Sequence, residues 1–248
     1  MKSKIVLLLI ALFVLGCNKK PSAINKISNV DTLNQNLSEE KEESFKEDLT
    51  LEQPNFSKTG KTIEDFVLEP YEIQMKAEGF LNDDTLKDVV LVLQNKNDVS
   101  DNRVVLVLLK QEKGGFKLHD TSWEALEPYS QEDGFVMYDH EKISIDNKTL
   151  HILLQGTGPV VARETLYKYI DNVLVLVGIS TFHSGAGSFV TSNYNLISGE
   201  ADHELANTIN DSMPSDYEVK KKFQLKRKML FASDNPNTIL ESLPHAEW

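Results

Sequence analysis

The sequence has few of the features that cross-link a chain, hold soft metals or bind nucleic acid. Cys17 is the one cysteine in 248 residues, which excludes a disulfide within the chain and any Cys-x-x-Cys metal or redox motif. Lys and Arg number 26 against 38 Asp and Glu, and a net charge of −12 argues against a surface that neutralises nucleic-acid phosphates. The sequence also has no Gly-x-Ser-x-Gly motif and no His pair at i, i+4 spacing, the signatures of α/β-hydrolases and zinc helices.

The amino terminus has the composition of an export signal. Two lysines, Lys2 and Lys4, precede an unbroken apolar run over residues 5–15. This run of 11 residues is too short for a transmembrane helix, which needs about 20, but it suits the apolar centre of a signal peptide. The run ends in Val14-Leu15-Gly16-Cys17, which resembles the lipobox of bacterial lipoproteins.

The lipobox resemblance implies a signal peptide over residues 1–16, removed after Gly16, and acyl chains on Cys17. Two or more acyl chains anchor a protein firmly, because each buried CH₂ contributes about 0.8 kcal/mol. Asn18 stands where many lipoproteins retained in the inner membrane have Asp, so the resemblance implies the outer membrane. The alternative is an ordinary signal peptide followed by a cysteine that carries no lipid.

Residues 17–62 have the composition of a tether. Residues 18–62 contain 7 Lys and 8 Asp or Glu, and their apolar residues are isolated. Such a segment buries too little apolar surface to offset the entropy of ordering, so we expect a flexible spacer. The alternative is a weak helix over residues 30–51. The remaining residues, 63–248, have 17 Lys and Arg against 30 Asp and Glu, and this domain of charge −13 carries the acidity.

The pattern in residues 63–248 predicts an all-β, mainly antiparallel domain that opens with a short helical turn at residues 62–68. Residues 89–93 and 104–109 are continuous apolar runs, which predict fully buried strands. Asp171 and Asn172 predict a tight hairpin turn, because both residue types tolerate positive φ. A β-sandwich, a barrel and a partial propeller all fit. The strands are expected at residues 71–77, 89–93, 104–109, 116–120, 143–145, 149–155, 164–170, 173–181, 189–196 and 223–231.

Residues 79–88 (GFLNDDTLKD), which precede the apolar run 89–93, resemble the loop of FG-GAP/VCBS-type repeats. The resemblance covers about residues 63–200 and implies an extracytoplasmic β domain with weak calcium ligands at Asn82, Asp84 and Asp88. Two positions depart from that pattern, because Phe80 replaces an acidic ligand and Thr85 replaces a glycine. The interpretation that we prefer from the residues alone is an Asx-type turn without a metal.

Residues 183–188 contain the weak catalytic candidates His183, Ser184 and Ser188. A histidine beside serines and glycines has a base, a nucleophile and backbone donors, the parts of a hydrolase site. The alternatives are a loop that contacts a ligand, or a plain glycine turn between two strands.

Three other groups of residues have less specific patterns. The Asp-His-Glu triplets at residues 139–141 and 202–204 are expected in solvated loops. The basic cluster 220–228 is expected on an edge strand, with Lys222, Lys226 and Lys228 on its outer side, where lysine discourages edge pairing. An aromatic groove for a glycan or peptide is a further hypothesis, and its candidates are Trp123, Tyr129, Tyr138, Tyr167 and Tyr169.

These patterns together predict a lipid-anchored envelope protein, facing the periplasm or the cell surface, with a binding or structural role and no catalysis. The expected partners are the membrane, through Cys17, and an envelope protein, peptide or glycan. No cofactor is expected beyond weakly bound calcium. The alternatives are an envelope hydrolase that uses residues 183–188 and a calcium-stabilised adhesion-type domain.

Overall fold

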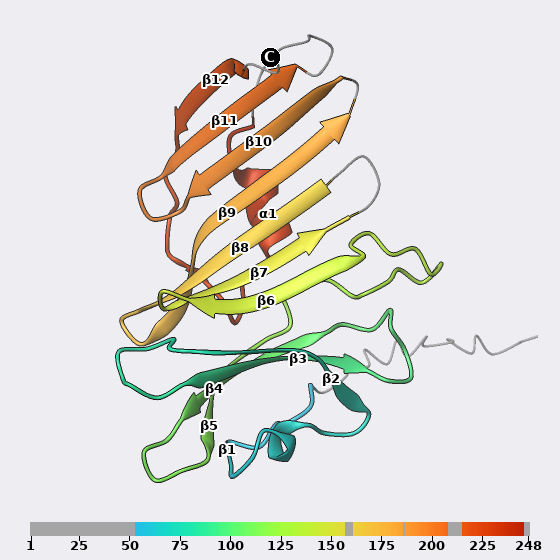
Figure 1. The fold of residues 1–248 in the computed structure, drawn as a ribbon, viewed down its shortest axis with the longest axis vertical. Helices are drawn as coiled ribbons and strands as arrows, with labels where there is room; N and C mark the ends of the chain where they lie inside the picture. The colour runs from blue at the N-terminus through green and yellow to red at the C-terminus, as the bar shows by residue number, and fades with distance from the viewer. Residues whose placement is uncertain (1–52, 157–160, 186, 208–214, 246–248) are drawn as a thin grey trace, which may run out of the picture. The chain divides into compact units, whose positions relative to one another are not determined.

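The computed structural model describes residues 53–156, 161–185, 187–207 and 215–245. These residues form two antiparallel sheets, shown in Figure 1. The helical elements of the described residues are a 3-10 turn at Glu64–Phe66 and one α-helix, α1 (Pro236–Ser242). The prediction of an all-β, mainly antiparallel fold with a short N-terminal helical turn is confirmed. The predicted signal peptide, Cys17 and most of the tether lie outside the described residues.

The first sheet has five strands in the order β1-β5-β4-β3-β2. Successive side chains of its strands β3 and β4 point alternately into two different apolar cores. Val90 and Val92 face one apolar cluster, and Leu91 faces the other, so every residue of the run is buried. This double burial explains the continuous apolar runs. The strands are β1 (Thr59–Gly60), β2 (Tyr71–Gly79), β3 (Asp88–Asn95), β4 (Val104–Lys110) and β5 (Phe116–Ser122).

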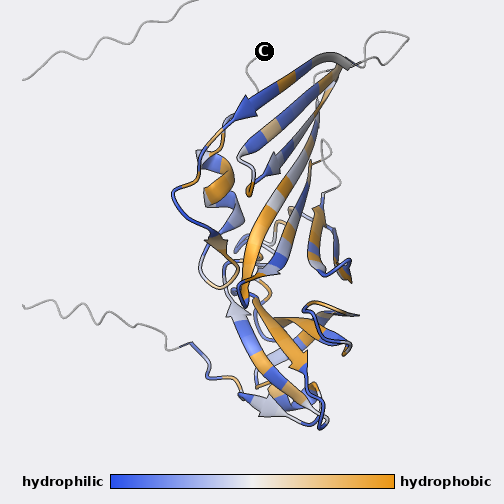
Figure 2. Ribbon diagram, turned by 90° about the vertical axis from the view of Figure 1, so that its left-hand side faces the viewer, coloured by the Kyte–Doolittle hydropathy of each residue, from blue (hydrophilic) through white to orange (hydrophobic). Residues whose placement is uncertain are grey.

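The second sheet has eight strands, seven in the order β12-β11-β10-β9-β8-β7-β6 and an eighth, β13, paired to β9. Asp171 and Asn172 have φ values of 56° and 62°, which confirms the predicted tight turn. Figure 2 shows α1 against one face of this sheet. The strands are β6 (His140–Asp146), β7 (Thr149–Gln155), β8 (Val161–Ile170), β9 (Val173–Gly185), β10 (Ser188–Asn195), β11 (Glu200–Asn207), β12 (Ser215–Lys222) and β13 (Met229–Leu230).

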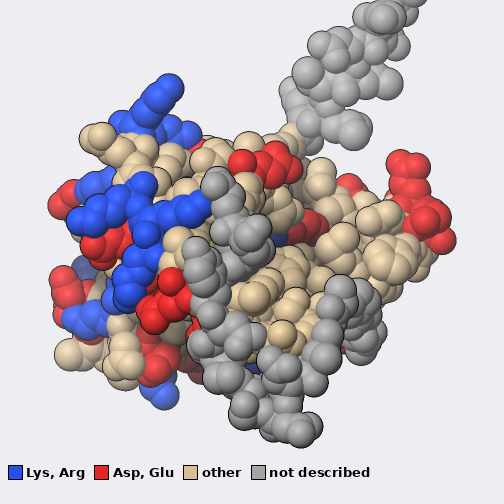
Figure 3. Space-filling view, turned by 90° about the horizontal axis from the view of Figure 1, so that it is seen from above, with Lys and Arg blue, Asp and Glu red and all other residues tan. Residues whose placement is uncertain are grey.

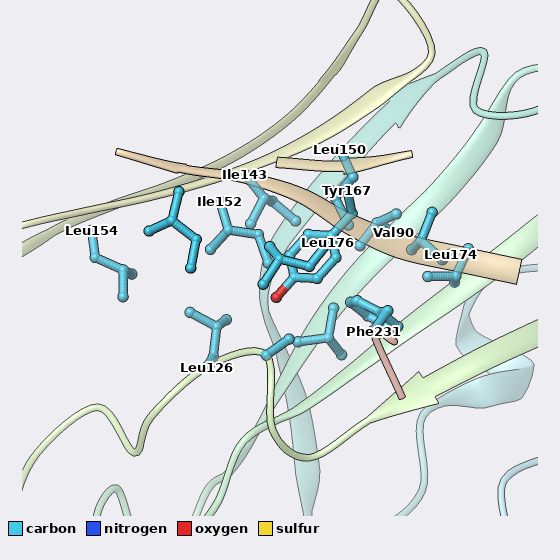
Figure 4. Close-up of a cluster of buried hydrophobic side chains, with 14 of the residues drawn as sticks. Val90, Leu126, Ile143, Leu150, Ile152, Leu154, Tyr167, Leu174, Leu176 and Phe231 are labelled. Atoms are coloured by element: carbon cyan, nitrogen blue, oxygen red, sulfur yellow. The ribbon is translucent and has the colours of Figure 1, made fainter. Parts of the chain in front are cut away.

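The main apolar core belongs to both sheets. Val90 and Val107 of the first sheet share it with Leu150, Tyr167 and other side chains of the second sheet. Figure 4 shows that the segment between β5 and β6 also contributes, through the side chain of Leu126. The segment that joins the two sheets, residues 123–139, is therefore packed into the core at its start. We call it the crossover segment.

A buried ion pair also links the two sheets. The Arg103 guanidinium, just before β4, donates to both carboxylate oxygens of Glu141 on β6, at 2.5 and 2.9 Å. It donates as well to the Gln74 side chain on β2, at 2.9 Å, and to the Glu127 carbonyl in the crossover segment, at 2.7 Å. The side chains of Arg103 and Glu141 are 1% and 7% exposed, so this charge pair is almost completely withdrawn from water.

The packed structure includes ten residues that composition assigns to the tether, residues 53–62. Phe56 is buried against Tyr71 and Trp123, and Thr59–Gly60 pairs with β5. This segment covers the face of the first sheet that lies opposite the main core.

The strand prediction is wrong in one region. Residues 200–207 and 215–222 form the unpredicted strands β11 and β12, and of the predicted strand 223–231 only β13 exists. Lys222 ends β12, the edge strand, but Lys226 and Lys228 lie beyond it. The outer faces of β11 and β12 carry pairs such as Asp202 with Lys220, so hydrophobicity gives no strand signal there.

Candidate functional site

An open hollow of about 850 Å³ lies between the crossover segment and the C-terminal part of the chain that holds α1. We call it the crossover hollow. Its volume is in the usual range of ligand sites, about 300–1,000 Å³. Most of its wall is apolar or aromatic, with side chains from Pro128, Tyr129, Phe135, Met137, Tyr138 and Leu240.

The crossover segment is fixed at its start by a buried serine. The Ser122 hydroxyl donates to the Phe231 carbonyl at 2.5 Å and accepts from the backbone N–H of Glu124 and Ala125. Further along, the Ser130 N–H donates to the Val99 carbonyl at 3.2 Å. These bonds hold the wall of the crossover hollow at two points along the chain.

A hydrogen-bonded loop holds Phe135 in solvent. The Gln131 N–H donates to the Phe135 carbonyl at 2.9 Å, and the Asp133 carboxylate accepts from the Phe135 N–H at 2.9 Å. Gly134 has a φ of +81°, which side chains rarely adopt, so glycine suits this turn. Phe135 and Met137 are nevertheless 54% and 49% exposed, so the fold presents two large apolar side chains at the hollow.

A second charge cluster includes two residues that line the crossover hollow, Glu127 and Asn237. The Arg163 guanidinium on β8 donates to both carboxylate oxygens of Glu127, at 2.5 and 2.8 Å, and to the Asn237 side chain. The Asn237 amide donates to Glu127 at 2.6 Å. Burial raises the pKa of Glu127, but the Arg163 charge and these hydrogen bonds outweigh it and hold the pKa below its usual range. Glu127 is therefore ionised and already paired.

The α1 helix is positioned by its own cap. The Asn235 side chain accepts from the Asn237 N–H at 2.9 Å, and Pro236 occupies the first helical position. The Asn235 amide also donates to Glu124 at 3.1 Å. The cap therefore links α1 to the crossover segment, and both of these segments contribute residues to the lining of the hollow.

The residues predicted as weak calcium ligands form backbone-capping turns. Asn82 accepts from the Asp84 N–H and Asp84 from the Leu86 N–H, each at 2.8 Å. Asp88 is buried and accepts from the N–H groups of Leu81 and Lys110, each at 3.1 Å. Burial raises the pKa of Asp88, while these N–H donors lower it in part. This geometry is that of the Asx-type turn preferred from the sequence, and calcium binding stays a prediction.

Replacing Asp88 with Ala should lower the free energy of unfolding by about 2–4 kcal/mol, because two backbone N–H groups lose their acceptor. Asp84→Ala, at an exposed turn, should cost about 0.5 kcal/mol or less. Urea unfolding of the full chain measures both. Thermal melting with and without calcium tests metal binding. We expect no change in the melting temperature. A rise with calcium that both substitutions abolish would establish the site instead.

The weak catalytic candidates lie at the ends of β9 and β10. His183 is exposed, and Ser184, as the next residue of the strand, points to the opposite face of the sheet. The Ser188 hydroxyl donates to the Gly185 carbonyl at 3.3 Å. The structure therefore does not pair Ser184 with His183 as nucleophile and base, and the hydrolase alternative stays without a geometric argument. Ala186, between them, lies outside the described residues.

The interpretation of the Asp-His-Glu triplets as solvated loops is wrong. His140 and Glu141 begin β6, where Glu141 binds Arg103, and Asp202, His203 and Glu204 lie within β11. His203 is fully buried, with its Nδ1 at 2.9 Å from the Ser192 hydroxyl. Strand alternation explains the difference, because it turns the histidine inward while its acidic neighbours face out.

His203 should make stability depend on pH. Burial, followed by the charges of Lys221 and His245, lowers the pKa of His203 from its ordinary 6.5. Below that pH the unfolded chain binds the proton more readily, so stability is present above pH 6.5 and is lost as the pH falls toward the folded pKa. Unfolding between about pH 7.5 and 5 should show this loss, and His203→Gln should reduce it. An equal reduction by His183→Gln, at an exposed site, would contradict this assignment.

Two of the aromatic residues proposed for a groove line the crossover hollow, Tyr129 and Tyr138. Trp123 packs beside Phe56, and Tyr167 is fully buried. The Tyr169 ring packs against His119 in a tilted arrangement, with ring centroids 4.9 Å apart. The sequence analysis does not predict α1 or the other lining residues that the argument uses: Glu127, Glu132, Phe135, Met137 and Glu241. A signal was present, since Phe135-Val136-Met137 is an apolar triplet inside a polar segment between strands.

Comparison of the chain with protein-family models, curated proteins and solved structures found no match. Among the described residues, no three His, Cys, Asp or Glu side chains come close enough to hold a metal ion together. Within the same ranges, no helix is long and apolar enough to span a membrane. The assignment of a function therefore depends on the crossover hollow and on the sequence motifs.

Proposed function

We propose that this chain is a lipid-anchored protein of the bacterial cell envelope, carried by acyl chains on Cys17 in the outer membrane, whose folded part binds a ligand in the crossover hollow. The role proposed for it is recognition without catalysis. The observation that carries the proposal is the exposure of Phe135 and Met137 in the lining of the crossover hollow, where hydrogen bonds hold the backbone of Phe135. Exposed apolar side chains at a concave surface are typical of binding sites.

The construction of the hollow supports this role. Hydrogen bonds of Ser122 and Ser130 hold its wall, Arg163 holds the lining residues Glu127 and Asn237, and the Asn235 cap holds its helix. A preformed site loses little conformational entropy when a ligand binds. The lipobox sequence supports the location, because an acylated Cys17 would keep this site at a membrane surface.

Site-specific photo-crosslinking in cells tests the proposal. A benzophenone amino acid at Phe135 should give discrete adducts in the envelope fraction. The same group at Phe80, which is 45% exposed but remote from the hollow, is the matched control. Adducts specific to position 135 support a ligand in the hollow. The absence of adducts at 135, or the same adducts at both positions, would contradict it.

A further inference from the structure

The charge of the crossover hollow is one-sided. Three glutamates line it, Glu127, Glu132 and Glu241, and no Lys or Arg is among its described lining residues. Glu127 is neutralised by Arg163. Glu132 and Glu241 make no ion pair with any described part of the chain, so two carboxylates at the hollow have no countercharge. A ligand that covers them needs positive groups of its own.

Among the described lysines, Lys221 contacts a residue that lines the hollow, because its ammonium donates to the His245 carbonyl at 2.6 Å. Lys220 contacts Asp202 and Glu218, and Lys228 contacts Asp171 at 2.7 Å. In the view from above, Lys and Arg gather toward one end of the surface, and the other end shows acidic and neutral side chains (Figure 3). Acidic side chains also lie among these Lys and Arg, while acidic surface at the other end of this face could attract a cation (Figure 3).

The apolar part of the hollow indicates which other groups a positively charged ligand should carry. Phe135 offers an aromatic ring, and Met137 offers a flexible, polarizable chain that adapts to different apolar side chains. Pro128 and Leu240 add wall that offers no side-chain hydrogen bond. Against these side chains an aliphatic group gains by leaving water. Elsewhere in the lining, Ser130, Gln131 and His245 can hydrogen-bond a polypeptide backbone.

We propose that the crossover hollow binds a cationic, apolar polypeptide segment, with Lys or Arg side chains against Glu132 and Glu241 and an apolar side chain between Phe135 and Met137. This inference rests on the proposed function and specifies its ligand. An acidic segment is repelled by the two glutamates, and a neutral glycan brings no positive charge to them. The partner is thus a polypeptide with a basic, amphipathic stretch.

The test uses the full chain in detergent and three fluorescent hexapeptides. One alternates lysine with leucine, one glutamate with leucine, and one lysine with serine. Fluorescence anisotropy should show binding of the lysine–leucine peptide, about tenfold weaker binding of the lysine–serine peptide and none of the glutamate–leucine peptide. Raising the salt from about 0.05 to about 0.5 M should weaken the lysine–leucine complex.

Two matched pairs of variants locate the binding. Glu132→Gln with Glu241→Gln should weaken the lysine–leucine complex about tenfold and flatten its salt dependence. Glu72→Gln with Glu112→Gln, which removes the same charge at remote exposed positions, should change little. Phe135→Ser with Met137→Ser should also weaken binding about tenfold, and Phe80→Ser should not. Circular dichroism melting confirms that each variant is folded.

Equal binding of the lysine–leucine and glutamate–leucine peptides, or an unchanged affinity in the Glu132/Glu241 variant, would overturn the proposal. Binding of a neutral hexasaccharide that depends on Phe135 would also overturn it, while the crossover hollow would stand as a binding site. If the unaltered chain binds neither the lysine–leucine peptide nor the hexasaccharide, and position 135 gives no crosslink, the proposed function itself is rejected. The two failures are therefore distinguishable.

Discussion

Replacing Cys17 with Ser should move the protein from the membrane fraction to the soluble fraction. The lipobox resemblance implies that this thiol accepts the first acyl group, and a serine hydroxyl would not replace it. Each chain contributes about 0.8 kcal/mol per buried CH₂, so loss of two or more chains removes most of the membrane affinity. Fractionation of cells by centrifugation, with immunodetection of the chain, measures the outcome.

A neighbouring substitution provides the control for the anchor. Asn18→Ser leaves the cysteine in place and should stay with the outer membrane. Asn18→Asp should shift the protein toward the inner membrane. If the Cys17→Ser protein remains in membranes after a high-salt wash, the anchor is elsewhere and the lipoprotein interpretation is wrong.

Replacing Arg103 with Ala should reduce the free energy of unfolding by about 3–5 kcal/mol. The substitution leaves the Glu141 carboxylate buried without its partner, and it also removes the donors to Gln74 and to the Glu127 carbonyl. A loss of this size is a large part of the about 5–15 kcal/mol that stabilises a typical domain. Urea unfolding of the full chain, followed by circular dichroism, measures it.

The double replacement Arg103→Met with Glu141→Leu separates pairing from packing. It removes both buried charges and keeps side chains of similar bulk, so it should recover most of the stability lost in Arg103→Ala. Lys76→Ala, which removes the exposed ion pair to Glu78, should cost about 1 kcal/mol or less. A cost for Arg103→Ala as small as that for Lys76→Ala would show that the buried pair does not hold the sheets together.

The sequence predicts β3 and β4 well, and the reason is physical. Strands buried on both faces are apolar at every position, so the composition of 89–93 and 104–109 alone identifies them. The strands β11 and β12 were missed because one face carries charge pairs in place of apolar side chains. Their partners across the sheet, such as Lys220 for Asp202, are visible only once the register is known.

The candidate site cannot be predicted from the sequence, for a different reason. Glu127 forms hydrogen bonds with Arg163, which lies 36 positions later in the chain, and with Asn237, which lies 110 positions later. No local pattern reports such contacts, because they depend on how the crossover segment and α1 are placed by the two sheets. The hypothesis of an aromatic groove includes Tyr129 and Tyr138 among its five candidates, and both line the hollow. It gave equal weight to Tyr167, which is buried in the core.

Thiol labelling offers the most direct test of the central claim, that the crossover hollow of a lipid-anchored chain is occupied in the envelope. An acylated Cys17 does not react with maleimide, so Met137→Cys places one reactive thiol at the hollow, and Phe80→Cys places one elsewhere. Met137→Cys should be labelled several-fold more slowly in isolated envelopes than in the purified protein, whereas Phe80→Cys should be labelled at similar rates in both. Equal rate ratios at the two positions, or labelling of Cys17 in the unaltered chain, would contradict the account.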